Sequence, residues 1–232
     1  MLKALEIVFG LILEKCMEAM GIVPVNFDLY AAVLLFSYMF GIFMLMYISF
    51  KMEKNELFYV FFFSIGIMTL WLYADLKKYL AIRPEEVMFW IRVEYFARMY
   101  SAPLWFALSE VYITRLDKFR KKPLTFIVAI FTFLYIAGGR EIGNYGILVS
   151  RTVAPSDPSF VVGYFITYAV IIYSIFRLNR YAFRNKGVYI NQAKLITHGI
   201  MFIFILDAVT VSQIVSLNFD IVPFGILACL LS

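Results

Sequence analysis

Long apolar blocks separated by short charged loops are the feature that most constrains what this chain can fold into. Seven such blocks follow one another, at residues 29–50, 57–74, 87–114, 124–138, 160–178, 195–215 and 221–232. A helix needs about 20 mainly apolar residues to cross the hydrocarbon of a bilayer, and most of the blocks meet or approach that length. A water-soluble domain of this size has a single core, which cannot bury so many apolar segments. We therefore predict an all-α fold, a polytopic helical bundle in a membrane with seven spans.

The composition favours the same class of protein. Hydrophobic residues make up 63% of the chain and charged residues 16%, whereas soluble domains typically carry about 25% charged residues. The net charge of +5 comes from basic residues in the short loops, a pattern typical of membrane orientation rather than of nucleic-acid binding. Cys16 and Cys229 are the two cysteines and lie in unrelated segments, so they predict neither a disulfide framework nor a metal site. No motif predicts a cofactor.

The two ends of the chain are predicted to differ from the spans between them. As a helix, block 221–232 rises only about 18 Å, so we expect it to be the start of a seventh span that continues past the last residue. Residues 1–28 mix apolar side chains with charges at helical spacing, namely Lys3, Glu6, Glu14 and Glu18. This pattern predicts an amphipathic helix lying in the membrane interface, with an eighth crossing as the alternative. Residues 1–28 and the bundle 29–232 are the two expected domains.

The distribution of Lys and Arg between alternate loops predicts the orientation. One side of the membrane would receive Lys51, Lys54, Arg115, Lys118, Arg120, Lys121, Lys122, Arg177, Arg180, Arg184, Lys186 and Lys194. The other side would receive Lys77, Lys78, Arg83, Arg140 and Arg151. Because the cytoplasmic side carries the excess of basic residues, we predict an external N-terminus and a cytoplasmic C-terminus.

Polar side chains inside the third and sixth predicted spans form a candidate ligand or signal cleft. Charged groups there cost about 2.5–3.5 kcal/mol on insertion scales and usually pair inside the bundle. The candidates are Arg92, Glu94, Arg98, Asp207 and Gln213. Counted along the helices at 1.5 Å per residue, Arg98 and Asp207 lie about 17 and 18 Å from opposite ends of their spans, so both should lie near the midplane and pair. Three alternatives remain: Glu94 neutralises Arg98 within one helix, Arg92 extends to the interface, and the pair only fixes helix register.

Two further features lie in the same spans. By the same counting Glu110 and His198 lie near the cytoplasmic end and are predicted to form a polar pair, either functional or simply structural. Pro103 interrupts the third span, where a proline removes a backbone hydrogen bond and kinks a helix; the kink could be a hinge or a fixed bend.

A series of short segments carries a family resemblance. They are 71–74 (WLYA), 89–95 (FWIRVEY), 102–106 (APLWF), 157–160 (DPSF), 163–165 (GYF), 191–194 (NQAK) and 222–225 (VPFG). In order and spacing this series resembles the N-terminal seven-transmembrane region of bacterial sensor histidine kinases. The similarity extends over roughly residues 30–232, and its specificity lies in the series rather than in any one motif.

The resemblance implies a sensory input module in the bacterial inner membrane. Such a module would detect an extracellular or membrane-borne small molecule or lipid and act through its seventh span on a cytoplasmic kinase or cyclase domain of the same polypeptide, as a homodimer. The only histidine, His198, lies in an apolar span where no kinase domain could reach it, so the chain alone is predicted not to be an enzyme. A small transporter or channel subunit and a membrane adaptor for a partner protein are the alternatives.

Overall fold

Every regular element that the structure describes is a helix. The structure is a computed structural model and describes residues 29–114, 127–133, 135, 158–184, 188–212 and 222–231. Its helices are α2 (Leu29–Lys51), α3 (Glu56–Leu80), α4 (Pro84–Thr114), α6 (Pro158–Arg184), α7 (Val188–Ser212) and α8 (Val222–Leu231). Residues 127–133 are helical as well. The prediction of an all-helical chain is confirmed for these residues, whereas the predicted interfacial helix within 1–28 lies outside them.

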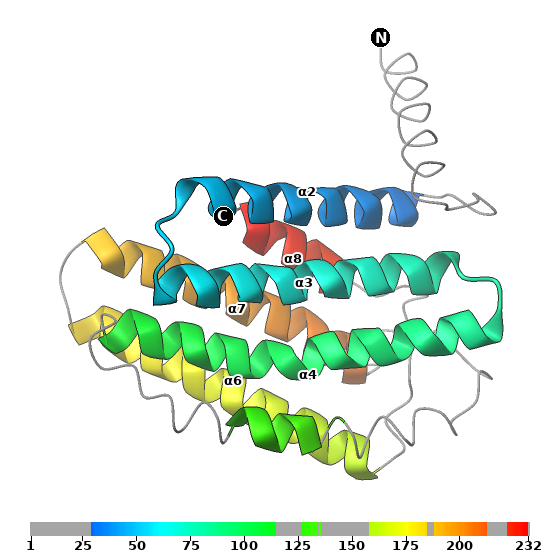
Figure 1. The fold of residues 1–232 in the computed structure, drawn as a ribbon. Coiled ribbons are helices and arrows are strands. Elements are labelled where there is room, and N and C mark those ends of the chain that lie inside the picture. The colour runs from blue at the N-terminus through cyan, green and yellow to red at the C-terminus, as the bar shows by residue number, and fades with distance from the viewer. Residues whose placement is uncertain are drawn as a thin grey trace.

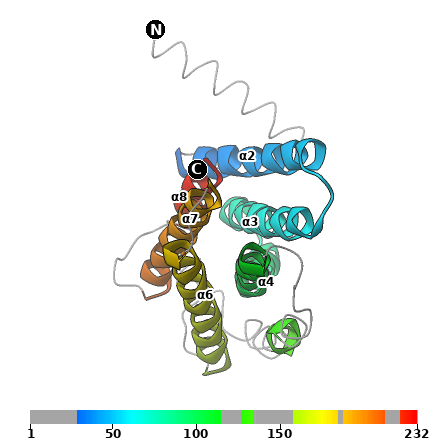
Figure 2. The same cartoon turned by 90° about the vertical axis from the view of Figure 1, so that its left-hand side faces the viewer.

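The helices pack side by side in a closed ring (Figure 1). Along the ring α2 contacts α3, α3 contacts α4, α4 contacts α6, α6 contacts α7, α7 contacts α8, and α8 returns to α2. Figure 2 shows α2, α3 and α4 following one another on one side of the bundle, with α8, α7 and α6 on the other. Residues that face the middle of this ring can therefore meet from both sides.

Local signals in the sequence explain where several helices begin. Asn55 precedes α3, and its side-chain oxygen accepts a hydrogen bond from the Phe58 amide at 2.9 Å, which satisfies one free donor of the first turn. Pro84 and Pro158 occupy the first positions of α4 and α6, where a proline costs no hydrogen bond. Only a few residues join α3 to α4, so these helices are antiparallel neighbours.

Several helices extend beyond the apolar blocks that predicted them. The second block was expected to end at residue 74, but α3 continues to Leu80, and α6 continues to Arg184 rather than to 178. Likewise α7 begins at Val188, two turns before the predicted 195. A helix satisfies its own backbone hydrogen bonds, so it continues into polar sequence until a breaking residue or a connection ends it.

Small residues allow helices of the bundle to approach closely. A Cβ atom placed on Gly163 of α6 would lie 3.0 Å from Met99 Cε and 3.1 Å from Tyr95 Oη of α4. On Gly225 of α8 it would lie 2.7 Å from a methyl group of Leu206 in α7. Such close approach is how helices in membranes gain packing contacts.

Three of the described helices are long and apolar enough to cross a membrane by length and composition. These segments are Tyr30–Lys51, Leu57–Leu80 and Val162–Phe183, in α2, α3 and α6. Helix α4 has the length but carries charges through its first half, including Glu94 and Arg98. The groups that these charged side chains contact therefore determine whether the helix can pack among apolar neighbours.

Candidate functional site

A buried ionic network begins on α4 with Glu94 and Arg98. They stand one helical turn apart, and Arg98 Nη2 lies 2.6 Å from Glu94 Oε1. Arg98 Nη1 also lies 3.2 Å from Asp207 Oδ1 of α7. The predicted pair between the two helices is therefore present, and so is the pairing within α4 that had been its alternative. One guanidinium thus contacts both carboxylates, which its fork of donors allows.

The network continues into the last turns of α3. Lys78 Nζ lies 2.7 Å from Asp75 Oδ1 in its own helix and forms a shorter ion pair with Glu94 of α4. The second apolar block was expected to end at residue 74 and Lys78 was counted as a loop residue, which was wrong. Asp75 is 1% exposed and Lys78 7%, so both belong to the interior of the bundle.

Aromatic side chains complete the surroundings of Arg98. Arg98 Nη1 donates a hydrogen bond to the Tyr164 hydroxyl at 3.0 Å, and the Tyr168 hydroxyl donates one to Asp207 Oδ2 at 3.1 Å. Both tyrosines come from α6. The guanidinium carbon also lies 4.9 Å from the centre of the Trp71 ring of α3, a cation–π contact. A single connected set of contacts thus joins α3, α4, α6 and α7.

Burial makes this network energetically demanding. Asp75, Lys78, Glu94, Arg98 and Asp207 are each at most 9% exposed. Removing one partner of a buried ion pair leaves an uncompensated charge and typically costs about 3–5 kcal/mol. The five groups therefore act as a unit, because moving any one of α3, α4 and α7 changes the surroundings of the charges on the other two.

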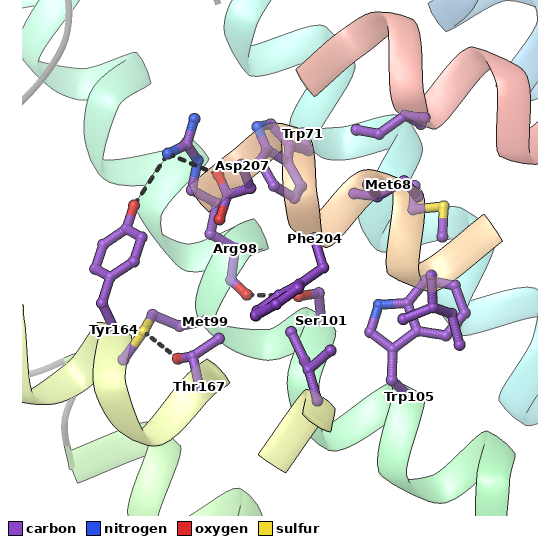
Figure 3. Close-up of a pocket in the computed structure, with 14 residues that line it drawn as sticks. Met68, Trp71, Arg98, Met99, Ser101, Trp105, Tyr164, Thr167, Phe204 and Asp207 are labelled. Atoms are coloured by element: carbon purple, nitrogen blue, oxygen red, sulfur yellow. Dashed lines mark hydrogen bonds and ion pairs between the residues drawn. The ribbon is translucent and has the colours of Figure 1, made fainter. Parts of the chain in front are cut away.

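A pocket lies beside the network in the middle of the ring (Figure 3). Its volume is about 30 Å³, and it is bounded by α3, α4, α6, α7 and α8. Arg98, Asp207 and Tyr164 form a polar end, and Trp105, Met68 and Phe204 belong to its apolar wall. Thr167 of α6 donates hydrogen bonds to the Gly163 carbonyl and to Met99 Sδ, so its hydroxyl is already used. The pocket thus joins charged groups to an aromatic interior.

The other predicted site residues lie elsewhere. Arg92 is exposed on α4, away from the network, so it does not belong to the predicted cleft; its interfacial position stays a prediction. Gln213 lies outside the described residues. Glu110 forms an ion pair with Arg177 of α6 at 2.6 Å, while His198 is exposed on α7, so the predicted pair of Glu110 and His198 is replaced by a different one.

Pro103 lies buried within α4, which continues as a helix on both sides of it. It follows Ser101, a pocket residue whose hydroxyl donates to the Arg98 carbonyl at 2.6 Å. Within the ranges that the structure describes, no three His, Cys, Asp or Glu side chains gather as metal ligands.

Sequence reasoning missed Asp75, Lys78, Tyr164, Tyr168 and Trp71. A usable signal existed for the first two, because Asp75 and Lys78 stand three positions apart, the spacing of an ion pair on one helix face. The tyrosines and the tryptophan carry no such signal among the 16 Tyr and 3 Trp of the chain.

One comparison with known proteins is positive. The family model described as the N-terminal 7TM region of histidine kinase matches residues 33–231. No curated protein and no solved structure matches the chain significantly. The matched residues include all six named helices except the first residues of α2, and they include every member of the ionic network.

Proposed function

Because the chain belongs to the family of N-terminal seven-transmembrane regions of histidine kinases, we propose that it senses a signal outside or within the membrane and passes it through α8 to a cytoplasmic output domain. The family and the apolar helices identify a membrane protein of two-component signalling.

The observation that carries the proposal is the buried network centred on Arg98. It connects helices from both sides of the ring, since Glu94 and Lys78 belong to α4 and α3 and Asp207 belongs to α7. If these charges only stabilised a single helix, they would not need contacts with side chains from four helices. An alternative arrangement of the same pairs would shift α7 relative to α4, and α7 packs directly against α8. The network is therefore suited to hold two discrete packings.

For the topology we propose seven spans, an external N-terminus and a cytoplasmic C-terminus in the bacterial inner membrane. The support is the excess of basic residues in alternate loops. Single cysteines placed at Glu53 and Glu85, both exposed at opposite ends of the α3–α4 hairpin, test it in intact cells once Cys16 and Cys229 have been replaced by serine. A membrane-impermeant thiol reagent should label the cysteine at 85 and should leave the one at 53 unlabelled until the cells are opened. The reverse pattern, or equal labelling, would contradict the orientation.

Substituting Asp207→Asn should change signalling without preventing insertion. The amide keeps the size of the side chain but removes the charge that holds α7 to Arg98, so the balance between the two packings should shift. Loss of one charged contact of about 1.4 kcal/mol would change the ratio of states about tenfold. The measurement is autophosphorylation, or cyclase activity, of the full-length protein in isolated membranes, with the amount of inserted protein determined in parallel.

The matched control is Glu86→Gln, the same kind of neutralisation at an exposed position in the first turn of α4. It should leave output at the wild-type level. Wild-type output from Asp207→Asn at normal insertion would show that the network only fixes helix register. Solute flux through the chain in liposomes, with output unaffected by Asp207→Asn, would favour the transporter alternative instead.

A further inference from the structure

The indole N–H of Trp71 is a buried donor without an acceptor among the residues that the structure describes. Trp71 is 4% exposed, lines the pocket and forms no hydrogen bond through Nε1 within the described part of the chain. More than nine in ten buried polar groups in proteins have a hydrogen-bond partner, so each exception requires an explanation. The ring lies against the Arg98 guanidinium at the polar end of the pocket (Figure 3). A ligand that brings an acceptor atom to this end would satisfy it.

The rest of the pocket wall selects for an apolar body. Met68, Met99, Trp105, Ile203 and Phe204 line it from three helices. The present volume of about 30 Å³ accommodates only a few atoms. The two methionines are unbranched and flexible, and such side chains adapt readily to irregular contents. A compact ligand can therefore be accommodated by side-chain movement together with a slight separation of the helices.

The charges of the site favour a neutral ligand. Arg98 is already held by Glu94 and Asp207 at 2.6 and 3.2 Å, so an anion would compete with two carboxylates in contact with the same guanidinium. A cation would face Arg98 itself and the Trp71 N–H, which is a donor. A neutral oxygen acceptor meets neither obstacle.

From these observations we propose that the pocket binds a small neutral apolar molecule with one hydrogen-bond acceptor, such as a ketone, aldehyde or ester carbonyl, and that Trp71 donates to that oxygen. The binding itself does not depend on the proposed sensory function; only the effect of binding on signalling rests on it. Such a molecule partitions into the bilayer and reaches the bundle through lipid. Because the pocket is bounded by helices from both sides of the ring, its expansion would move α7 and α8 relative to α4.

The test compares two probes of the same shape. Cyclopentanone and cyclopentane differ by one acceptor oxygen, and the chain contains three tryptophans, Trp71, Trp90 and Trp105, whose indole ¹H–¹⁵N signals can be assigned by Trp→Phe substitution. In lipid nanodiscs, cyclopentanone should shift the Trp71 indole proton downfield with saturation, and cyclopentane should not. Trp71→Phe, which removes only the N–H donor and the second ring, should weaken binding of cyclopentanone about fivefold, the effect expected for one hydrogen bond.

Trp90 provides the internal control, because it packs on Tyr73 and Phe89 rather than in the pocket. Its indole signal should shift no more with cyclopentanone than with cyclopentane. An unchanged Trp71 signal, or equal and unsaturated shifts with both probes, would overturn the proposal and leave the N–H to water. If cyclopentanone does not bind but Asp207→Asn alters output, the ligand class is wrong and the sensory proposal stands. If cyclopentanone binds but Asp207→Asn leaves output unchanged, the sensory proposal is wrong and the ligand class stands.

Discussion

Replacing Arg98 by leucine is expected to destabilise the bundle more than any other single substitution that we consider. The change removes the guanidinium that Glu94 and Asp207 share, together with the hydrogen bond to Tyr164. Leaving a buried carboxylate without its counter-charge typically costs about 3–5 kcal/mol. For a chain of this length such a loss corresponds to a decrease of roughly 10 °C in the thermal midpoint. Thermal unfolding of the purified protein in detergent, followed by size-exclusion chromatography, measures it.

Two companion variants make this expectation specific. Arg92→Leu removes an arginine from the same helix at an exposed position, so its thermal midpoint should stay within a few degrees of the wild type. The double substitution of Arg98 and Asp207 by leucine should be more stable than Arg98→Leu alone, because it removes a carboxylate that the single variant leaves uncompensated. Equal midpoints for Arg92→Leu and Arg98→Leu would mean that the network contributes little to stability.

The sequence was sufficient to predict that the described elements are helices and that Arg98 and Asp207 meet. Apolar blocks of span length predicted the helices, because a helix satisfies all its backbone hydrogen bonds within one segment even in lipid. The pair of Arg98 and Asp207 followed from depth alone, since two opposite charges at the same level of a bundle have a strong reason to meet. The depth of a residue depends only on the rise per residue of its helix, and not on the order of the helices around the ring.

Depth along the helix axis did not predict the correct partner for Glu110, near one end of the same helices. Glu110 and His198 were matched by level, but His198 lies on an exposed side of α7, and Arg177 of α6 pairs with Glu110 instead. Level along the axis is encoded locally in the sequence, whereas the order of helices around the ring depends on packing between distant segments. For the same reason the sequence could not indicate that Trp71 and Tyr164, from α3 and α6, meet at one arginine.

Asp75 and Lys78 were missed for a different reason. A charged run after an apolar block is usually a solvated loop, and composition alone cannot distinguish that case from a helix that carries its charges into the bundle. In the structure Lys78 reaches Glu94 of α4, so the end of α3 is stabilised by the same network that holds α7. The charges of α3 and α4 thus neutralise each other, which explains how α4 can lie among apolar helices despite its composition.

The close contact between α4 and α6 predicts the second large effect. Gly163→Leu should weaken the bundle by about 3 kcal/mol, the upper part of the range for overpacking, because even a Cβ atom there would lie 3.0 Å from Met99 Cε and 3.1 Å from Tyr95 Oη. The larger side chain must displace the Met99 and Tyr95 side chains or separate α6 from α4, and a separation also lengthens the contact of the adjacent Tyr164 with Arg98. Gly66 of α3 is the matched control, since nothing lies within 4 Å of a Cβ atom built there. Gly66→Leu should therefore unfold near the wild-type temperature and Gly163→Leu several degrees below it. Equal unfolding temperatures would contradict the close approach of the two helices, on which the position of Tyr164 in the site depends.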